Sequence, residues 1–99
     1  LKILEPGITA SDLWDRSFEI INDESLEEYQ PTFEKVFGGF DGMEMSPPSL
    51  IAEVVWEAVT DGKDTLRYRA GPDAVELLER RKRQDDATFI AEMKAGLGL

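Results

Sequence analysis

The chain has 99 residues, enough for one small domain, and its 21 acidic and 11 basic residues give a formal net charge of −10. This acidic balance argues against nucleic acid as a main partner, because phosphate binding needs a basic face, and against an anionic membrane surface. The absence of cysteine and histidine excludes disulfides, thiolate metal sites and imidazole acid–base catalysis. No apolar run reaches the roughly 18 residues of a membrane-spanning helix.

The first expected element is a strand over about residues 1–5. Its apolar residues are stopped by Glu5-Pro6-Gly7, because proline donates no ladder hydrogen bond and glycine allows a sharp turn. Ligands of open α/β sheets bind at the carboxyl ends of strands. This turn, with the hydroxyls of Thr9 and Ser11 after it, is therefore a candidate pocket edge, although an ordinary strand-to-helix turn is the commoner alternative. Because the chain begins inside a strand without methionine, we expect a piece of a longer chain.

Two helices and a glycine-rich segment are expected next. Apolar side chains recur at near-helical spacing within residues 10–22, at Leu13, Trp14, Phe18 and Ile21. Ser25 and Glu28 match a capping box, which predicts a second helix with Pro31 near its start. Residues 38–48 hold three glycines, two prolines and two methionines, so they are either a plain linker or a mobile lid over a substrate.

The clearest expected helix spans residues 46–62. Ser46 is a good N-cap, Pro47 suits the first helical position, and Gly62 is the expected stop. A second strand is predicted over residues 65–70 by its alternating pattern. Along it, the side chains expected to share one face are those of Leu66, Tyr68 and Ala70.

C-terminal helices are expected over residues 74–95, after Gly71-Pro72-Asp73 closes the second strand. Within them, the charged run 79–86 is more typical of a solvated helix face than of a binding patch, because acids flank its four bases. The element order favours two parallel strands joined by a helical crossover. Since two strands make a poor sheet, we expect a missing amino-terminal part or a partner chain to complete it.

The residues themselves offer no catalytic constellation. The serines lack a histidine that could activate them, and the acid pairs Asp12/Asp15 and Glu27/Glu28 are expected to face water. The glycine-rich run 38–42 does not follow a strand, which makes it a weak phosphate-site candidate. We predict no metal site and no catalytic residue, so the chain alone is expected to catalyse nothing.

The chain resembles the carboxyl-terminal part of a classical short-chain dehydrogenase/reductase. Residues 1–11 resemble that family's sixth strand and Pro-Gly turn, and residues 46–62 resemble the helix before the last strand. Residues 66–74, LRYRAGPDA, resemble the last strand and the start of the final helix. The resemblance covers essentially all 99 residues. It implies an α/β fold: the C-terminal fragment of a Rossmann-like doubly wound domain, with two parallel strands, over about 1–5 and 65–70, and four or five helices.

The resemblance also implies where cofactor and substrate would lie. Family members bind NAD or NADP with the Pro-Gly turn beside the nicotinamide, and the matching residues here are Pro6, Gly7, Thr9 and Ser11. Thr9 would contact the carboxamide through its backbone, and Ser11 stands where the family usually has threonine. Residues 12–45 match the variable substrate lid, whose candidate lining residues are Trp14, Phe18, Phe37, Phe40, Met43 and Met45.

The family's glycine-rich cofactor turn, catalytic serine and tyrosine–lysine pair all lie upstream of its Pro-Gly turn, and none is present here. Neither Tyr29 nor Tyr68 has a lysine four residues later. The resemblance therefore implies a parent enzyme that transfers hydride between NAD(P) and an alcohol or carbonyl substrate. The 99-residue chain alone is expected to be inactive and to bind no cofactor.

The family commonly forms a subunit contact through its last strand and helix, which implies a homo-oligomer through Leu66, Tyr68 and residues 75–78. We expect a cytoplasmic protein with no nucleic-acid or membrane partner. Two alternatives stay open. The chain could be an acidic module that binds a partner through its Met/Phe-rich centre, or a dimerisation unit.

Overall fold

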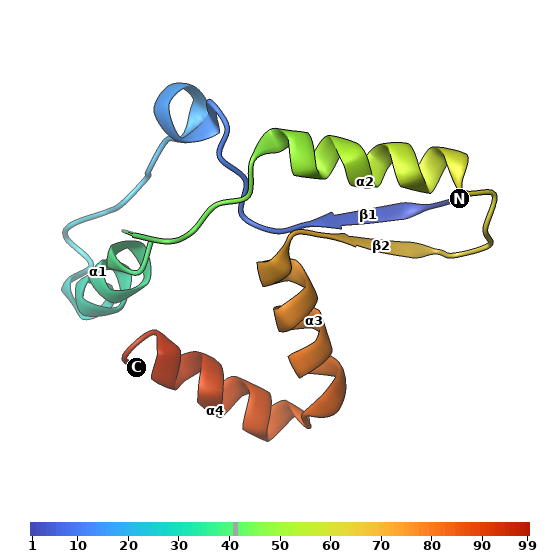
Figure 1. The fold of residues 1–99 in the computed structure, drawn as a ribbon. Coiled ribbons are helices and arrows are strands. Elements are labelled where there is room, and N and C mark those ends of the chain that lie inside the picture. Colours follow the sequence, from blue (N-terminus) through green and yellow to red (C-terminus); the bar gives the residue numbers. More distant parts are fainter. Residues whose placement is uncertain (41) are drawn as a thin grey trace.

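The computed structural model describes residues 1–40 and 42–99, and it has the mixed α/β architecture that the sequence predicts (Figure 1). Its elements are β1 (Ile3–Pro6), a π-helical turn (Leu13–Ser17), a 3-10 turn (Glu27–Tyr29), α1 (Gln30–Gly38), α2 (Pro48–Thr60), β2 (Arg67–Ala70), α3 (Pro72–Arg83) and α4 (Asp86–Gly96). Within the described ranges, none of these helices has the length and apolar composition needed to cross a bilayer.

The two strands lie side by side and run parallel, as expected (Figure 1). The register pairs Ile3 with Arg67, Leu4 with Tyr68, Glu5 with Arg69 and Pro6 with Ala70. In β2, Tyr68 and Ala70 are buried while Arg67 is exposed, which confirms the predicted alternation for these residues. Leu66 precedes the strand, which begins at Arg67 rather than at residue 65, and it is exposed.

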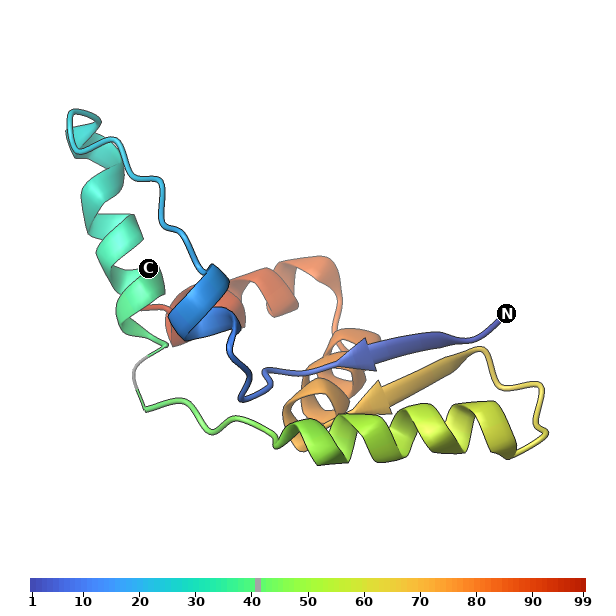
Figure 2. The same cartoon turned by 90° about the horizontal axis from the view of Figure 1, so that it is seen from above.

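The second α-helix, α2, covers one face of the strand pair (Figures 1 and 2). Its start differs from the expected residue 46, because Pro48 forces the residue before it into an extended conformation. Pro47 accordingly has φ −67° and ψ 147° and takes the N-cap position, so Ser46 is not the cap. At the other end, Gly62 has φ +67°, the left-handed conformation that makes glycine the usual helix stop.

The segment between β1 and α1 differs most from the prediction. The helix expected over residues 10–22 is wrong, because only the π-helical turn forms there and Phe18 leaves it with extended backbone, at φ −81° and ψ 116°. The capping box is also wrong: the Ser25 hydroxyl donates to the Asp23 carboxylate at 2.6 Å, and helical structure begins at Glu27. Short helices are marginal in water without tertiary packing, and residues 15–29 are all exposed.

The last two helices form where C-terminal helices were expected, and they meet at a sharp corner (Figure 1). The first of them, α3, begins at Pro72 rather than at residue 74, since proline suits the opening turn of a helix. Asp85 caps α4 by accepting a hydrogen bond from the Thr88 N–H at 2.8 Å. Two ion pairs in the charged run lie at the surface, Arg69 with Glu79 and Arg81 with Asp86.

The buried core is small. Among the described residues, the buried apolar side chains are those of Ala58, Tyr68, Ala70 and Ala74. The radius of gyration is 16.7 Å, against about 13 Å for a compact domain of 100 residues, and α1 reaches away from the strands (Figure 2). Trp56 and Val59 of α2 remain 71% and 74% exposed, so the strand pair and its helices bury little of one another.

A polar cluster at the amino end of the strands ties α2 to both of them. The Asp61 carboxylate accepts hydrogen bonds from the Lys2 ammonium at 2.8 Å, the Tyr68 hydroxyl at 2.5 Å and the Lys63 N–H at 2.9 Å. These donors, that of Lys2 foremost, hold the pKa of the Asp61 carboxyl well below its ordinary value of 3.8. The same pairing raises the pKa of the Lys2 ammonium.

We expect this cluster to make the fold sensitive to acid. Because the pKa of Asp61 is depressed in the folded state, its stabilisation is present above the unfolded pKa of about 4 and is lost as the pH falls further. Asp61→Asn should therefore lower Tm at neutral pH and reduce the fall of Tm on acidification, measured by circular dichroism. Asp64→Asn, which changes an exposed acid of the same loop, is the control. Identical Tm profiles for Asp61→Asn and the unsubstituted protein would contradict this prediction.

Candidate functional site

The Pro-Gly turn at the carboxyl end of β1 is held by contacts from three directions. The Gly7 N–H donates to the Ala70 carbonyl at 2.8 Å, which extends the parallel ladder one residue beyond β1. The Ile8 N–H donates to the Asp73 carboxylate at 2.7 Å, and the Thr9 hydroxyl donates back to the Gly7 carbonyl at 3.1 Å. The turn is therefore fixed by β2 and by the start of α3.

Ser46 lies beside the same turn, just before α2. Its N–H donates to the Ile8 carbonyl at 2.9 Å, and its carbonyl accepts from the Ala10 N–H at 2.9 Å. These two bonds make Thr9 and Ser46 an isolated parallel bridge, in which Ser46 is only 7% exposed. The carboxyl end of the 38–48 segment is therefore anchored on the turn, which neither the linker nor the lid interpretation had predicted. Asp41, within the weak phosphate-site candidate, lies outside the described residues.

In this arrangement the main-chain N–H and C=O of Thr9 are open, which means that they have no hydrogen-bond partner among the described residues. Its neighbours Ile8 and Ala10 direct their paired groups toward Ser46, so the N–H and C=O of Thr9 point the other way. Neither group has a hydrogen-bond partner within residues 1–40 and 42–99. The turn thus presents one donor and one acceptor side by side on a single residue.

Two glycines allow the Asp73 carboxylate to approach the turn. A Cβ atom at Gly7 would stand 2.0 Å from Asp73 Oδ1, and one at Gly71 would stand 2.9 Å from the same oxygen. Gly71 also has φ +108°, a conformation that side chains rarely adopt. Asp73 Oδ1 is buried and has no hydrogen-bond partner in the described part of the chain. A side chain at either glycine would displace this carboxylate.

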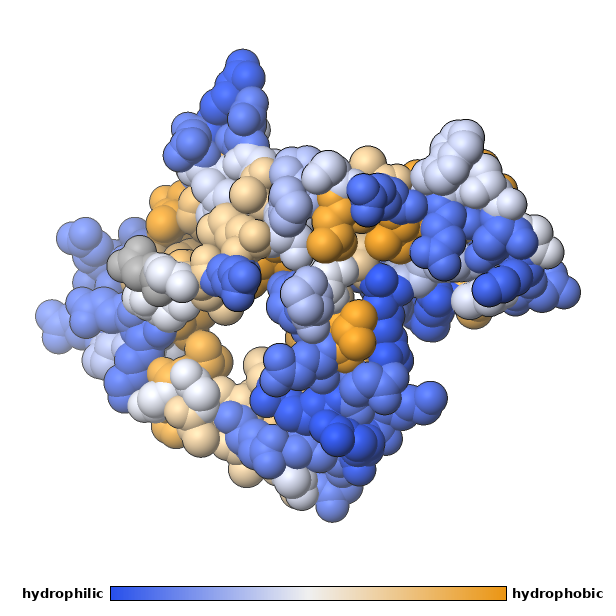
Figure 3. Space-filling model, in the orientation of Figure 1, coloured by the Kyte–Doolittle hydropathy of each residue, from blue (hydrophilic) through white to orange (hydrophobic). Residues whose placement is uncertain are grey.

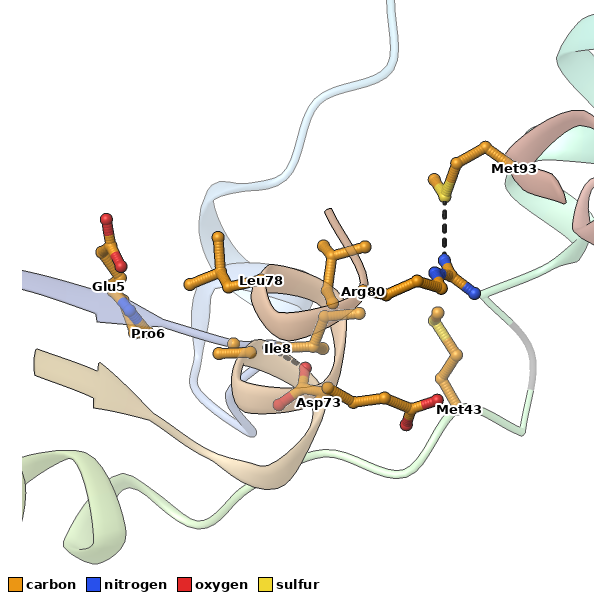
Figure 4. A pocket seen from close by; sticks show the side chains of 12 residues that line it. Glu5, Pro6, Ile8, Met43, Asp73, Leu78, Arg80 and Met93 are labelled. Carbon is orange, nitrogen blue, oxygen red and sulfur yellow. Dashed lines mark hydrogen bonds between the residues drawn. The ribbon is translucent and has the colours of Figure 1, made fainter. Parts of the chain in front are cut away.

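A cavity of about 710 Å³ opens beside the turn (Figures 3 and 4). Its wall is mostly apolar and is formed by Glu5, Pro6, Gly7, Ile8, Met43, Asp73, Ala74, Glu76, Leu77, Leu78, Arg80 and Met93. Its volume lies within the range of small-molecule sites. In Figure 4, Met43 and Met93 approach Arg80 from opposite sides, and Arg80 Nη2 lies 3.2 Å from the Met93 sulfur. The cavity therefore joins the turn, α3, α4 and the 38–48 segment.

The structure gathers some of the predicted cofactor residues and separates one. Pro6 and Gly7 line the cavity, and Thr9 follows them at the bridge to Ser46. Ser11 is exposed, and its hydroxyl lies 3.4 Å from the Leu13 N–H at the start of the π-helical turn. In the described residues Ser11 makes no contact that would fix it toward the cavity.

The predicted substrate residues fall into three places, and Met45 lies apart from the others, in the wall of a smaller pocket beside Ser46 and Leu50. Met43 lines the cavity. The four aromatic residues pack instead against one another and Phe33, with ring centroids between 4.4 and 6.4 Å apart; they are Trp14, Phe18, Phe37 and Phe40. None of these rings is among the residues that line the cavity, so here they form a separate aromatic cluster.

Sequence reasoning missed Asp73 and Arg80 as site residues. In the sequence, Asp73 is only part of a strand end and helix start, and Arg80 is only part of a charged run typical of a solvated helix face. For Asp73, the only indication in the sequence is the presence of Gly7 and Gly71, the two glycines that leave room for its carboxylate. For Arg80 no pattern in the sequence distinguishes it from the three bases that follow it.

Two known proteins are similar to this chain along its whole length. The chain is 36% identical over 101 aligned residues to two proteins of Schizosaccharomyces pombe, each named an uncharacterized oxidoreductase. The alignments cover the whole of this chain but 42% of each relative. No family model matches the chain, and no solved structure matches it. The chain is therefore similar, from end to end, to one part of longer proteins named as oxidoreductases.

Gly7→Ala should disrupt the turn, because the new methyl group would collide with the Asp73 carboxylate. We expect loss of the bond from Ile8 and a reduction in the free energy of unfolding of about 1–3 kcal/mol, measured by urea denaturation. Gly38→Ala, at the end of α1 with nothing within 4 Å of the new methyl, should leave stability nearly unchanged. Equal stabilities for the two variants would show that the close approach does not constrain the turn.

Proposed function

We propose that this chain forms one wall of the nicotinamide and substrate pocket of an NAD(P)-dependent oxidoreductase of the short-chain dehydrogenase/reductase type. The observation that carries the proposal is the open N–H and C=O of Thr9 at the carboxyl end of β1. A primary carboxamide, such as that of nicotinamide, has one acceptor oxygen and an NH₂ donor. It therefore complements the donor and acceptor that Thr9 presents, in the region of the sheet where α/β proteins bind ligands.

The residues of the turn have distinct parts in this proposal. Thr9 would orient the carboxamide through its main chain, and Gly7, which has no side chain, would let the ring approach the end of β1. Pro6 and Ile8 contribute apolar wall to the cavity, which would exclude water from one side of a bound ring. A bound nicotinamide cofactor would supply hydride transfer to or from an alcohol or carbonyl substrate.

The proton-transfer groups of the reaction are not assigned to this chain. Serine, tyrosine and lysine in the pattern of the short-chain dehydrogenases are absent from it, and the chain spans 42% of the length of its curated relatives. We propose that the remaining length supplies these groups and the glycine-rich cofactor turn. Met43 brings the lid-like segment to the cavity, which supports a partly apolar substrate on that side.

Cofactor binding at Thr9 is tested by hydrogen–deuterium exchange on the full natural protein that contains this chain. The Thr9 amide has no partner among the described residues, so it should exchange fast and become protected when NADH or NADPH is added. Amides of residues 63–66, at the far end of the strands, serve as the control and should not change. Protection elsewhere with Thr9 unaffected would contradict the proposed site, and absence of any binding would contradict the cofactor.

We further propose that the parent protein is a homo-oligomer that assembles through β2 and α3. Leu66, Val75 and Leu77 are each more than 40% exposed, so apolar surface is available there. Val75→Glu should shift the protein toward monomer in sedimentation equilibrium, because a buried charge at a subunit contact is costly. Glu76→Lys, on the same helix, also alters charge but removes no apolar surface. It is therefore the control, and its mass in sedimentation equilibrium should not change. An unchanged mass for Val75→Glu would argue against this interface.

A further inference from the structure

We infer that Asp73 is a positioning residue for the ligand-binding turn: its carboxylate holds the Gly7–Ile8 peptide and, together with Ser46 on the next peptide, limits the direction of the open main chain of Thr9. The inference rests on the proposed function, since it gives Asp73 a part in nicotinamide binding. Asp73 would act through the turn rather than by touching the cofactor. Figure 4 shows its side chain directed from α3 toward Ile8.

The first support is the connection that Asp73 makes. The bond from the Ile8 N–H to Asp73 Oδ2 is 2.7 Å long and joins residues 65 positions apart in the sequence. A hydrogen bond to a carboxylate is stronger than one to a neutral acceptor. The Ile8 N–H belongs to the Gly7–Ile8 peptide, and the Thr9 N–H belongs to the next peptide, whose Ile8 carbonyl is held by Ser46. Asp73 therefore acts on Thr9 by limiting, together with Ser46, the backbone angles of Ile8 between these two peptides.

The second support is that an ordinary helix-start role does not account for Asp73. An aspartate at the start of a helix usually accepts a hydrogen bond from an N–H of its own first turn. In α3, the cap position is occupied by Gly71, and the start of the helix has no side-chain cap bond. The Asp73 carboxylate instead leaves its own helix and bonds to the turn after β1.

The third support is that this contact leaves one carboxylate oxygen in an unfavourable environment and restricts two other positions to glycine. Asp73 Oδ1 is buried without a partner in the described residues, and an unpaired buried oxygen is unfavourable. The close approach also requires glycine at both Gly7 and Gly71. Three positions are thus committed to bringing one carboxylate to one peptide N–H, at the place where Thr9 is left open.

The remaining contacts of the turn complete the constraint. The Gly7 N–H is held by Ala70, and the Ile8 carbonyl and Ala10 N–H are held by Ser46. Asp73 supplies the bond to the Ile8 N–H, the only side-chain bond among these four. Of these four bonds, only the bond to Asp73 can be removed by replacing a side chain, and its removal leaves the strand pairing unaltered.

The test compares Asp73→Ala with Asp73→Asn in the full natural protein, by titrating NADH and NADPH fluorescence and by following exchange of the Ile8 amide. Asparagine keeps an acceptor oxygen at the same reach, so it should bind nearly as well as the unsubstituted protein and keep Ile8 protected. Alanine should expose Ile8 and raise Kd for the cofactor at least about tenfold. Glu79→Gln changes an exposed acid of the same helix that does not line the cavity. It is the matched control and should not change Kd.

If Asp73→Ala does not fold, Asp73→Ser replaces it, because serine is tolerated at a helix start and its side chain is shorter. Equal Kd for the alanine or serine variant and the unsubstituted protein, with only Tm lowered, would overturn the positioning role while leaving the proposed function standing. Failure of asparagine to restore binding would also overturn it. If the unsubstituted protein binds neither NADH nor NADPH, the proposed function fails, and the role of Asp73 in it fails as well.

Discussion

The parallel pairing of β1 with β2 is the interaction on which the rest of this structure depends. It brings Pro6 opposite Ala70, so that the turn after β1 and the start of α3 meet at one end of the sheet. The Asp73 contact to Ile8 follows directly from that register. At the opposite end, the same pairing places Lys2 and Tyr68 around Asp61. Each end of the strand pair is thus closed by a polar contact between distant residues.

The candidate site is a consequence of how backbone groups are shared at the turn. Ser46 and Asp73 occupy the groups on either side of Thr9, and they leave the N–H and C=O of that residue without a partner in the part of the chain that the structure describes. When a ligand binds to the main chain of a residue, its orientation depends less on the side chain of that residue than on the contacts that hold the backbone in place. For this reason the informative residues are Ser46, Asp73 and the two glycines beside Asp73, and the hydroxyls of Thr9 and Ser11 matter less.

Local patterns predicted the elements whose shape local chemistry determines. Proline and glycine marked the end of β1, alternation marked β2, and Gly62 marked the end of α2. The apolar spacing within residues 10–22 predicted a helix, but no helix of that length forms there. A short helix needs a tertiary surface to pack against, and the spacing alone does not show whether one exists. The contact between Asp73 and Ile8, and the bridge between Thr9 and Ser46, join residues far apart in sequence. Such contacts depend on strand register, which the local pattern of one short strand does not determine.

The proposed function depends most on a hydrogen-bonded contact between a nicotinamide carboxamide and the main chain of Thr9. The most direct measurement is a crystal structure of the full natural protein with NAD⁺ or NADP⁺ bound. We predict that the carboxamide oxygen and nitrogen lie within hydrogen-bonding distance of the Thr9 N–H and C=O, with the Asp73 bond to Ile8 intact. A nicotinamide ring placed away from this turn, or Thr9 groups bonded to other protein atoms, would contradict it.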